Sequence, residues 1–175
     1  MQIATWNVNS VRSRLTHVVD WLTENPVDVL CLQETKVVDR DFPLAPFEAI
    51  GYTAAISGQK SYNGVALLSR QPLDAISAGF SSVLGADTVG ELDEQKRVIT
   101  GVLDGVRIVN LYVPNGSALG SDKYAYKLRW LETLQGYLKA LLAENPAVLV
   151  CGDFNIALED IDIHEIGRAS CRERV

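Results

Sequence analysis

The order of apolar runs and turn signals near the N-terminus constrains the fold more than any other feature of this sequence. Gln2–Val8 is a short apolar run that ends in polar residues. The next apolar residues recur at helical spacing, which predicts a helix over about Val11–Glu24 with Ser10 as its N-cap. Asn25-Pro26 ends this helix, and Val27–Leu32 is expected to be a buried strand. A strand, a helix and a strand in this order predict a βαβ-type unit.

The rest of the chain adds hairpins and a long helix to this unit. Asp104-Gly105 separates two apolar runs and favours a tight hairpin turn. Leucines at three- and four-residue steps predict a helix over Tyr124–Glu144, and the polar segment Ser81–Glu94 is expected to be a loop. The other expected strands are Tyr52–Ser57, Gly64–Ser69, Leu73–Phe80, Arg97–Leu103, Val106–Val113 and Ala147–Cys151. Hairpins mixed with βαβ units predict a layered α/β domain with helices outside its sheets.

The composition is that of an ordinary globular domain. Of the 175 residues, 47% are hydrophobic and 22% charged, which excludes disorder, collagen and a coiled coil. No apolar run approaches the ~20 residues of a membrane helix, and we expect a cytoplasmic protein that contacts no membrane. Cys31 and Cys151 lie in apolar runs, which favours buried thiols over disulfides. The net charge of −6 argues against attraction of nucleic acid to the whole surface, although a local basic patch or a bound cation can overrule it.

The last residues, Glu165–Val175, differ from the rest of the chain because they have no apolar periodicity and carry three arginines. One back-translation of this segment resembles a common sequencing-library adapter read in frame. We therefore interpret 165–175 as a non-native tail and 1–164 as the natural sequence. The alternative is a genuine disordered basic tail.

Polar residues follow four of the expected strands. They are Asn7 and Asn9; Gln33 and Glu34; Asn110, Tyr112 and Asn115; and Asp153 and Asn155. Ligand and catalytic groups gather at the carboxyl ends of strands in α/β sheets, although Asn and Asp are also common strand terminators. Carboxylate and amide oxygens suit Mg²⁺ or Mn²⁺, and the two histidines lie too far apart for a zinc site. Glu34 and Asp153 are the candidate carboxylates, and a phosphate ester is the expected substrate.

Five motifs carry a resemblance to a known family. They are TWNVNSVRSRL (5–15), LQETK (32–36), NGVALLS (63–69), NLYVPNG (110–116) and GDFNIA (152–157). In this order they resemble the exonuclease III family, abasic-site endonucleases of the endonuclease/exonuclease/phosphatase superfamily. The resemblance runs from Met1 to about His164 and identifies 1–164 as the N-terminal part of such a domain.

The resemblance implies a metal site and a set of catalytic residues. Glu34 is the principal metal candidate, with Asn7 beside it and Asp153 and Asn155 nearby. Asp153 is then expected to orient or deprotonate the attacking water, and Asn155 to hydrogen-bond the charge that develops on the phosphate. Tyr112 matches the family's active-site tyrosine, as either a hydrogen-bond donor or a phenolate. The implied cofactor is Mg²⁺, with Mn²⁺ as an alternative.

The resemblance also implies DNA contacts, a fold and an activity. Arg97, Lys36 and Asn115 are the expected DNA-binding residues. The implied fold is a four-layer αββα sandwich with two mixed sheets, its second half incomplete here. The implied activity is Mg²⁺-dependent cleavage 5′ to abasic sites, with 3′-to-5′ exonuclease action on duplex DNA, by a protein that is monomeric at full length.

The family's later motifs are missing from this sequence, including the Ser-Asp-His motif that supplies its histidine. His164 does not match that motif, and we assign it no catalytic role. A sheet that lacks strands exposes several hundred Å² of apolar surface, at a cost on the order of 10 kcal/mol. We therefore expect the 175-residue chain alone to be poorly soluble and inactive.

Two other functions remain open at this stage. Another phosphoesterase of the superfamily, acting on a phosphoinositide or RNA, would also carry the QET and GDxN motifs. A non-catalytic DNA-binding protein would need a concentrated basic surface, whereas only scattered pairs such as Arg12 with Arg14 and Lys96 with Arg97 are visible.

Overall fold

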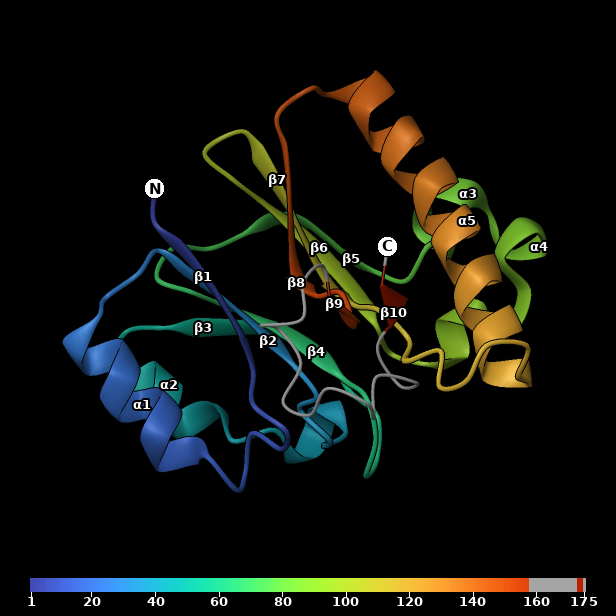
Figure 1. The fold of residues 1–175 in the computed structure, drawn as a ribbon. Coiled ribbons are helices and arrows are strands. Elements are labelled where there is room, and N and C mark those ends of the chain that lie inside the picture. The colour runs from blue at the N-terminus through green and yellow to red at the C-terminus, as the bar shows by residue number, and fades with distance from the viewer. Residues whose placement is uncertain (158–172, 175) are drawn as a thin grey trace.

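The computed structural model describes residues 1–157, 173 and 174. Within these residues, two four-stranded sheets pack face to face, and helices cover both outer faces (Figure 1). The layers follow the order helix, sheet, sheet, helix, and both sheets contain parallel and antiparallel pairs. The α/β sandwich with two mixed sheets that the sequence predicts is therefore confirmed.

The first sheet contains the N-terminal strands in the order β1-β2-β4-β3. Its strands are β1 (Ile3–Asn7), β2 (Val29–Gln33), β3 (Thr53–Ser57) and β4 (Val65–Ser69). β1 runs parallel to β2, and β4 is antiparallel to both β2 and β3. The connection from β1 to β2 through helix α1 (Leu15–Glu24) is the βαβ unit expected from the sequence.

The second sheet has the order β5-β6-β7-β8. Its strands are β5 (Asp74–Ala78), β6 (Val98–Leu103), β7 (Val106–Tyr112) and β8 (Val148–Asp153). Asp104 and Gly105 join β6 to β7 with φ values of +51° and +78°, so the expected tight turn is present. β7 and β8 are parallel, and a short parallel ladder joins β9 (Ile156–Ala157) to β10 (Glu173–Arg174).

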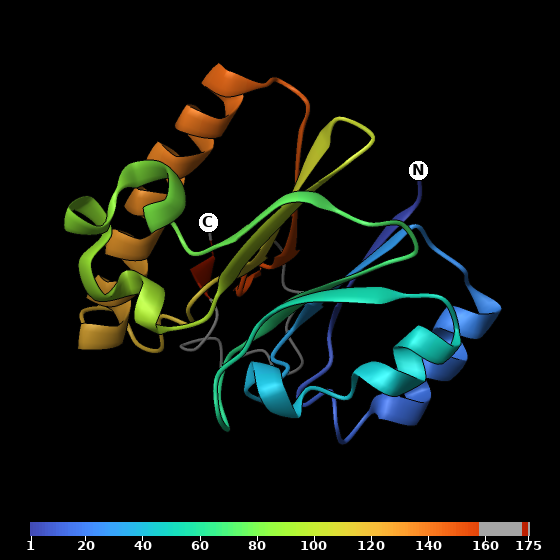
Figure 2. The ribbon, with the colours of Figure 1, turned by 180° about the vertical axis from the view of Figure 1, so that it is seen from behind.

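The helices divide between the two outer faces, as the opposite views in Figures 1 and 2 show. The first sheet carries α1, the 3-10 turn η1 (Asp39–Asp41) and α2 (Leu44–Ala49). The second sheet carries α3 (Ser81–Leu84), α4 (Ala86–Val89), the 3-10 segment η2 (Gly90–Glu94) and α5 (Asp122–Glu144). None of the helices in the described ranges is long and apolar enough to cross a membrane.

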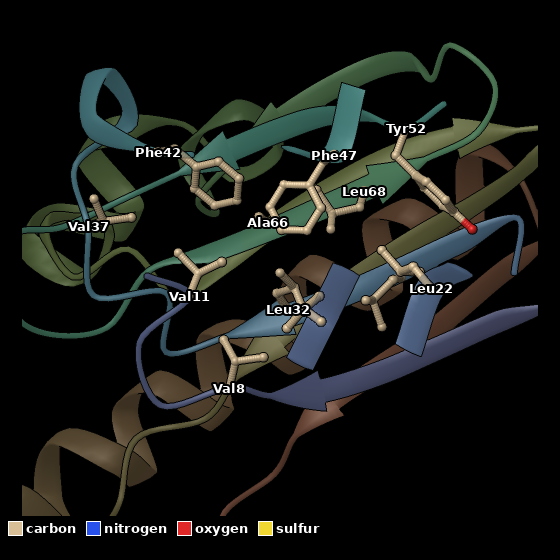
Figure 3. Packing of buried hydrophobic residues seen from close by; sticks show 12 residues of the cluster. Val8, Val11, Leu22, Leu32, Val37, Phe42, Phe47, Tyr52, Ala66 and Leu68 are labelled. Atoms are coloured by element: carbon tan, nitrogen blue, oxygen red, sulfur yellow. The ribbon is translucent and has the colours of Figure 1, made fainter. Parts of the chain in front are cut away.

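Three apolar clusters correspond to the three interfaces between the layers. Leu22 of α1 and Phe47 of α2 pack on the first sheet (Figure 3), and Val18 of α1 belongs to the same cluster. Trp130 and Tyr137 of α5 pack around Phe80 beside the second sheet, with ring centroids 5.1 Å and 5.3 Å from that of Phe80. The third cluster fills the space between the sheets and includes Val29, Cys31, Leu67, Ile99 and Ile108.

Two expectations for local structure were wrong. Helix α1 begins at Leu15 rather than Val11, and Ser10 accepts a hydrogen bond from the Ser13 amide (3.3 Å) within a preceding turn. Ser81–Glu94 is three short helical segments rather than a loop, because the Asp93 carboxylate accepts the Phe80 and Ser81 amides at 2.8 Å and 2.9 Å. The expectations for His164 and for the tail lie outside the described residues, apart from Glu173 and Arg174.

Candidate functional site

The carboxyl ends of four strands meet at one edge of the sandwich. β1 and β2 are parallel neighbours in the first sheet, β7 and β8 are parallel neighbours in the second, and β1 contacts β8 across the interface. This arrangement brings Asn7, Glu34, Tyr112 and Asp153 to the same place. The clustering predicted from the polar residues at the strand ends is therefore present.

Asn7 joins the carboxylates of the two sheets. Its Nδ2 donates to Glu34 Oε1 at 3.0 Å and to Asp153 Oδ2 at 2.8 Å. Its Oδ1 accepts the Asn9 amide at 3.0 Å, which orients the side-chain amide with its nitrogen toward the acids. Two carboxylates separated by 119 positions in the sequence thus converge on a single nitrogen atom.

Glu34 receives hydrogen bonds from three side chains. Besides Asn7, the Tyr112 hydroxyl donates to its Oε1 at 2.7 Å, and Lys36 Nζ lies 2.9 Å from its Oε2. Burial raises the pKa of Glu34, but the hydrogen bonds from Asn7, Lys36 and Tyr112 together lower that pKa below its usual value. Glu34 is therefore a carboxylate at neutral pH.

Tyr112 is a hydrogen-bond donor in this structure. Burial first, and then the hydrogen bond to the Glu34 carboxylate, raise the pKa of Tyr112 far above its usual value. The phenol therefore keeps its proton at neutral pH and donates a hydrogen bond to the Glu34 carboxylate.

Asp153 is the last residue of β8, and Asn155 lies in the short turn that joins β8 to β9. The Asn155 amide donates to Asp153 Oδ1 at 2.9 Å, and the Asn155 Nδ2 donates to the Val113 carbonyl at 2.8 Å. The backbone φ of Asn155 is +50°, in the left-handed region that asparagine tolerates better than most residues. The turn holds Asp153 with its second oxygen, Oδ2, directed at Asn7.

Arg97 stacks on Tyr112 beside a surface cavity. Its guanidinium carbon lies 4.6 Å from the Tyr112 ring centroid, and its Nη1 and Nε donate to the Tyr112 carbonyl (3.2 Å) and to Gln95 Oε1 (2.8 Å). The cavity has a volume of about 350 Å³. It is lined by Gln95, Arg97, Tyr112, Pro114, Asn115, Asp122, Lys123 and Tyr126. Of the three residues expected to bind DNA, Arg97 and Asn115 thus share this cavity, whereas Lys36 contacts Glu34.

A buried polar contact lies behind the site and was not predicted. Gln33 Nε2 donates to Asn110 Oδ1 at 2.7 Å across the sheet interface, and Asn110 Nδ2 donates to the Leu32 and Ala66 carbonyls at 2.9 Å and 3.0 Å. Both side chains are buried. The sequence placed Gln33 and Asn110 at strand ends but carried no signal that they contact each other.

Lys127 of α5 is a second residue that the sequence analysis missed. Its side chain is buried, and its Nζ donates to the Asn155 carbonyl at 3.1 Å. A signal was available, because Lys127 is in helical phase with the buried residues Trp130, Leu134, Tyr137 and Leu141.

The donor set fits a hard divalent cation. Such ions bind one or two carboxylates together with neutral oxygens, and Glu34 and Asp153 supply two carboxylates around one point. In the part of the chain that the structure describes, no group of three or more His, Cys, Asp and Glu side chains is placed to hold a metal ion. The hard oxygen donors that the site offers are thus the two carboxylates of Glu34 and Asp153.

Comparison with known proteins identifies the family of the chain. The profile of the Endonuclease/Exonuclease/phosphatase family matches residues 4–173. The chain belongs to this family. The family includes divalent-metal-dependent nucleases.

Curated relatives of the family confirm the resemblance that the five motifs indicate. The chain is 34% identical to an exodeoxyribonuclease of Bacillus subtilis over 167 residues, which is 93% of this chain and 62% of the relative. It is 32% identical to exodeoxyribonuclease III of Haemophilus influenzae over 168 residues, or 60% of that protein. A DNA repair nuclease, APEX1 of Danio rerio, is 34% identical over 169 residues and 51% of its length. The chain therefore spans between half and two thirds of the length of these relatives.

Solved structures of the family share the fold. An AP endonuclease from Archaeoglobus fulgidus superposes with a TM-score of 0.84 and 40% identity, covering 99% of this chain and 65% of that one. A 3′-5′ exonuclease from Neisseria meningitidis gives a TM-score of 0.83 and 39% identity, covering 91% and 60%. The αββα sandwich is therefore the common architecture of this chain and these nucleases.

Proposed function

We propose that the protein is a Mg²⁺-dependent DNA-repair phosphodiesterase that cleaves 5′ to abasic sites and removes nucleotides from 3′ ends of duplex DNA. The observation that carries the proposal is the convergence of Glu34 and Asp153 on the Asn7 amide nitrogen. This arrangement provides two carboxylates for one cation at the edge of the sandwich. The names of the relatives supply the substrate class.

The metal site in this proposal consists of Glu34, Asn7, Asp153 and Asn155. When bound there, Mg²⁺, or Mn²⁺ in its place, supplies Lewis-acid polarisation of a phosphoryl oxygen. The lowered pKa of Glu34 supports this role, since a ligand must be ionised at neutral pH.

The other roles follow from hydrogen-bonding capacity. Asp153 Oδ2 accepts the proton of the attacking water, and a new bond forms between the water oxygen and phosphorus. The bond from phosphorus to the 3′ oxygen of the preceding nucleotide breaks, and the departing 3′ oxygen takes up a proton from bulk water. Tyr112, as a neutral phenol, donates a hydrogen bond, and the second proton of the Asn155 amide faces the charge that develops on the phosphate.

Cationic and amide side chains at the same edge would bind the DNA. Arg97 and Asn115 bind backbone phosphates from the cavity, and Lys36 does so from beside Glu34. A related 3′ phosphatase from Neisseria, 38% identical and with a TM-score of 0.84, was solved with a product DNA hairpin. The partner we propose is duplex DNA with abasic sites or 3′ ends, bound by a monomer in the cytoplasm.

The proposal is tested with a labelled duplex that carries one abasic site, compared with a soluble phosphomonoester and a single-stranded RNA. Each substrate is incubated with Mg²⁺ and with chelator. The assay uses the 175-residue chain and the protein encoded by the reading frame of the source locus, read across the codon for His164. The protein that nicks the duplex, whether the 175-residue chain or the locus-encoded protein, is the active form.

Mg²⁺-dependent nicking 5′ to the abasic site, lost in Asp153→Asn and retained in the exposed control Asp74→Asn, is the expected result. Preferential hydrolysis of the phosphomonoester or of RNA would instead assign the protein to another phosphoesterase activity. Binding of the duplex in chelator without cleavage in Mg²⁺ would indicate a non-catalytic DNA-binding protein. Either result would overturn the proposal.

A further inference from the structure

Lys127 is a buried cation on the helix behind the candidate site. Only 1% of its surface is exposed, although lysine is almost never fully buried unless its ammonium group is paired. The side chain enters the molecule from α5 on the same face as Trp130 and Leu134, which are apolar core residues. Its Nζ donates to the carbonyl of Asn155, 28 residues further along the chain.

The turn that Lys127 reaches has several anchors. The Asn155 amide caps Asp153 Oδ1 at 2.9 Å, and the Val113 amide donates to the Asp153 carbonyl at 2.9 Å. The Asn155 side chain is attached to the Val113 carbonyl at 2.8 Å. Lys127 adds a contact from α5 to this turn, whereas the other three hydrogen bonds run within the turn or to the segment after β7.

The orientation of this turn decides where the Asp153 carboxylate lies. With Oδ1 capped by the Asn155 amide, Oδ2 is directed at the Asn7 nitrogen 2.8 Å away. A left-handed residue such as Asn155, with φ of +50°, persists only when its surroundings hold it there. The hydrogen bond from a fixed ammonium to its carbonyl is one such constraint.

We propose that Lys127 is a positioning residue for the reaction, an inference that rests on the function proposed above. It holds the 153–155 turn so that Asp153 and Asn155 keep their places against Asn7. Lys127 itself touches neither substrate nor metal. A displacement of about 1 Å at reacting groups can cost on the order of a hundredfold in rate, so a contact of this kind affects turnover more than binding.

The alternative role for Lys127 is filling the core with its apolar stem. Lys127→Met separates the two roles, because methionine keeps an unbranched stem of similar length and removes the ammonium group. Lys127→Arg keeps the charge and a donor. Lys139→Met is the matched control, since Lys139 is an exposed lysine on the same helix.

The experiment measures kcat, the Kd for an uncleaved abasic duplex, and amide hydrogen exchange by NMR in these variants. In the active form, Lys127→Met is expected to lower kcat by about tenfold to a hundredfold, with Kd within about threefold of the wild type. Exchange at the Asn155 and Val113 amides is expected to accelerate about tenfold, while the β7 amides of Ile108 and Val109 stay unchanged. Lys127→Arg is expected to recover part of kcat, and Lys139→Met to match the wild type.

Three results would overturn the inference. The first is a kcat of Lys127→Met within threefold of the kcat of Lys139→Met. The second is amide exchange in Lys127→Met that accelerates as much in β7 as at Asn155 and Val113. The third is a loss of duplex affinity in Lys127→Met as large as its loss of kcat. If the wild type cleaves no substrate, the proposed function fails, and exchange in the 175-residue chain decides this inference alone. Acceleration confined to the amides that contact the turn then supports it, and unchanged exchange refutes it.

Discussion

The buried contact between Gln33 and Asn110 provides a direct test of how the two sheets are held in register behind the site. Asn110 is fully buried, and its side chain accepts a hydrogen bond from Gln33 and donates to the Leu32 and Ala66 carbonyls. Asn110→Ala removes all three bonds at once. Because each buried hydrogen bond contributes about 1 kcal/mol, the free energy of unfolding should fall by about 3–4 kcal/mol.

This loss is a large share of the ~5–15 kcal/mol that stabilises a typical domain. For a chain of this size, each kcal/mol shifts Tm by roughly 2–4 °C, so Asn110→Ala should melt about 6–16 °C below the wild type. Urea unfolding followed by circular dichroism measures the same loss as a shift in midpoint, provided that the m value is unchanged.

Two comparisons assign the loss to the contact between the sheets. Asn25→Ala removes an exposed asparagine whose amide donates to the Trp21 carbonyl at the end of α1, and it should cost less than about 1 kcal/mol. A double-mutant cycle of Asn110→Ala with Gln33→Met should give a coupling energy of about 1 kcal/mol. A loss below about 1 kcal/mol for Asn110→Ala, or a coupling energy of zero, would refute the reasoning.

Three further predictions follow from the site and its surroundings. Because the pKa of Glu34 is lower in the folded protein than in the unfolded chain, its ionised form stabilises the fold at neutral pH, and this contribution is lost as pH falls through the folded pKa. Glu34→Gln should therefore lose less stability than the wild type between pH 7 and pH 3, and an identical loss in urea titrations would contradict this. Gly152→Ala places a Cβ atom 2.0 Å from the Leu111 carbonyl oxygen at φ of +136°, so its Tm should fall far more than that of Gly85→Ala, which has a positive φ but open space. A divalent cation at ten times its Kd should raise the free energy of unfolding of the wild type by about 1.4 kcal/mol, which corresponds to a rise of roughly 3–6 °C in Tm. Asp153→Asn should abolish this rise, and equal shifts of Tm in the two proteins would argue against the site.

The elements that could be predicted from the sequence are those decided by local signals. The apolar spacing of α5, the Asp104-Gly105 turn and the buried runs of β2 and β4 all appear within a few residues of their expected positions. Clustering of the polar strand ends within each sheet was also predictable, because parallel neighbours bring their carboxyl ends to one edge. In these cases the deciding interaction lies within the segment or between neighbouring strands.

The features that could not be predicted depend on contacts between distant segments. The helical turns within 81–94 depend on Asp93, whose carboxylate binds amides 12 and 13 positions earlier, and nothing in the local pattern indicates that contact. Ser10 is a good N-cap by residue type, yet α1 begins only at Leu15. The Ser10 and Val11 amides instead donate to the Glu34 and Thr35 carbonyls, at 2.7 Å and 3.2 Å. The hydrogen bond that the Tyr112 hydroxyl donates to Glu34, 78 positions away, likewise had no local signal.

Contacts between distant segments also hold several residues of the site in an unfavourable backbone conformation. Asn9, Ser10, Glu34, Lys36 and Asn155 all have positive φ, although none of them is glycine, and all belong to the segments around the candidate site. Each such residue costs on the order of 1 kcal/mol or more and persists only where the surroundings hold it. Glu34 and Asp153 add like charges to one amide nitrogen, and the Lys36 ammonium offsets only part of that repulsion. A cation that binds both carboxylates must therefore replace the Asn7 Nδ2 donor between them, and its charge would offset the repulsion that the Lys36 ammonium leaves.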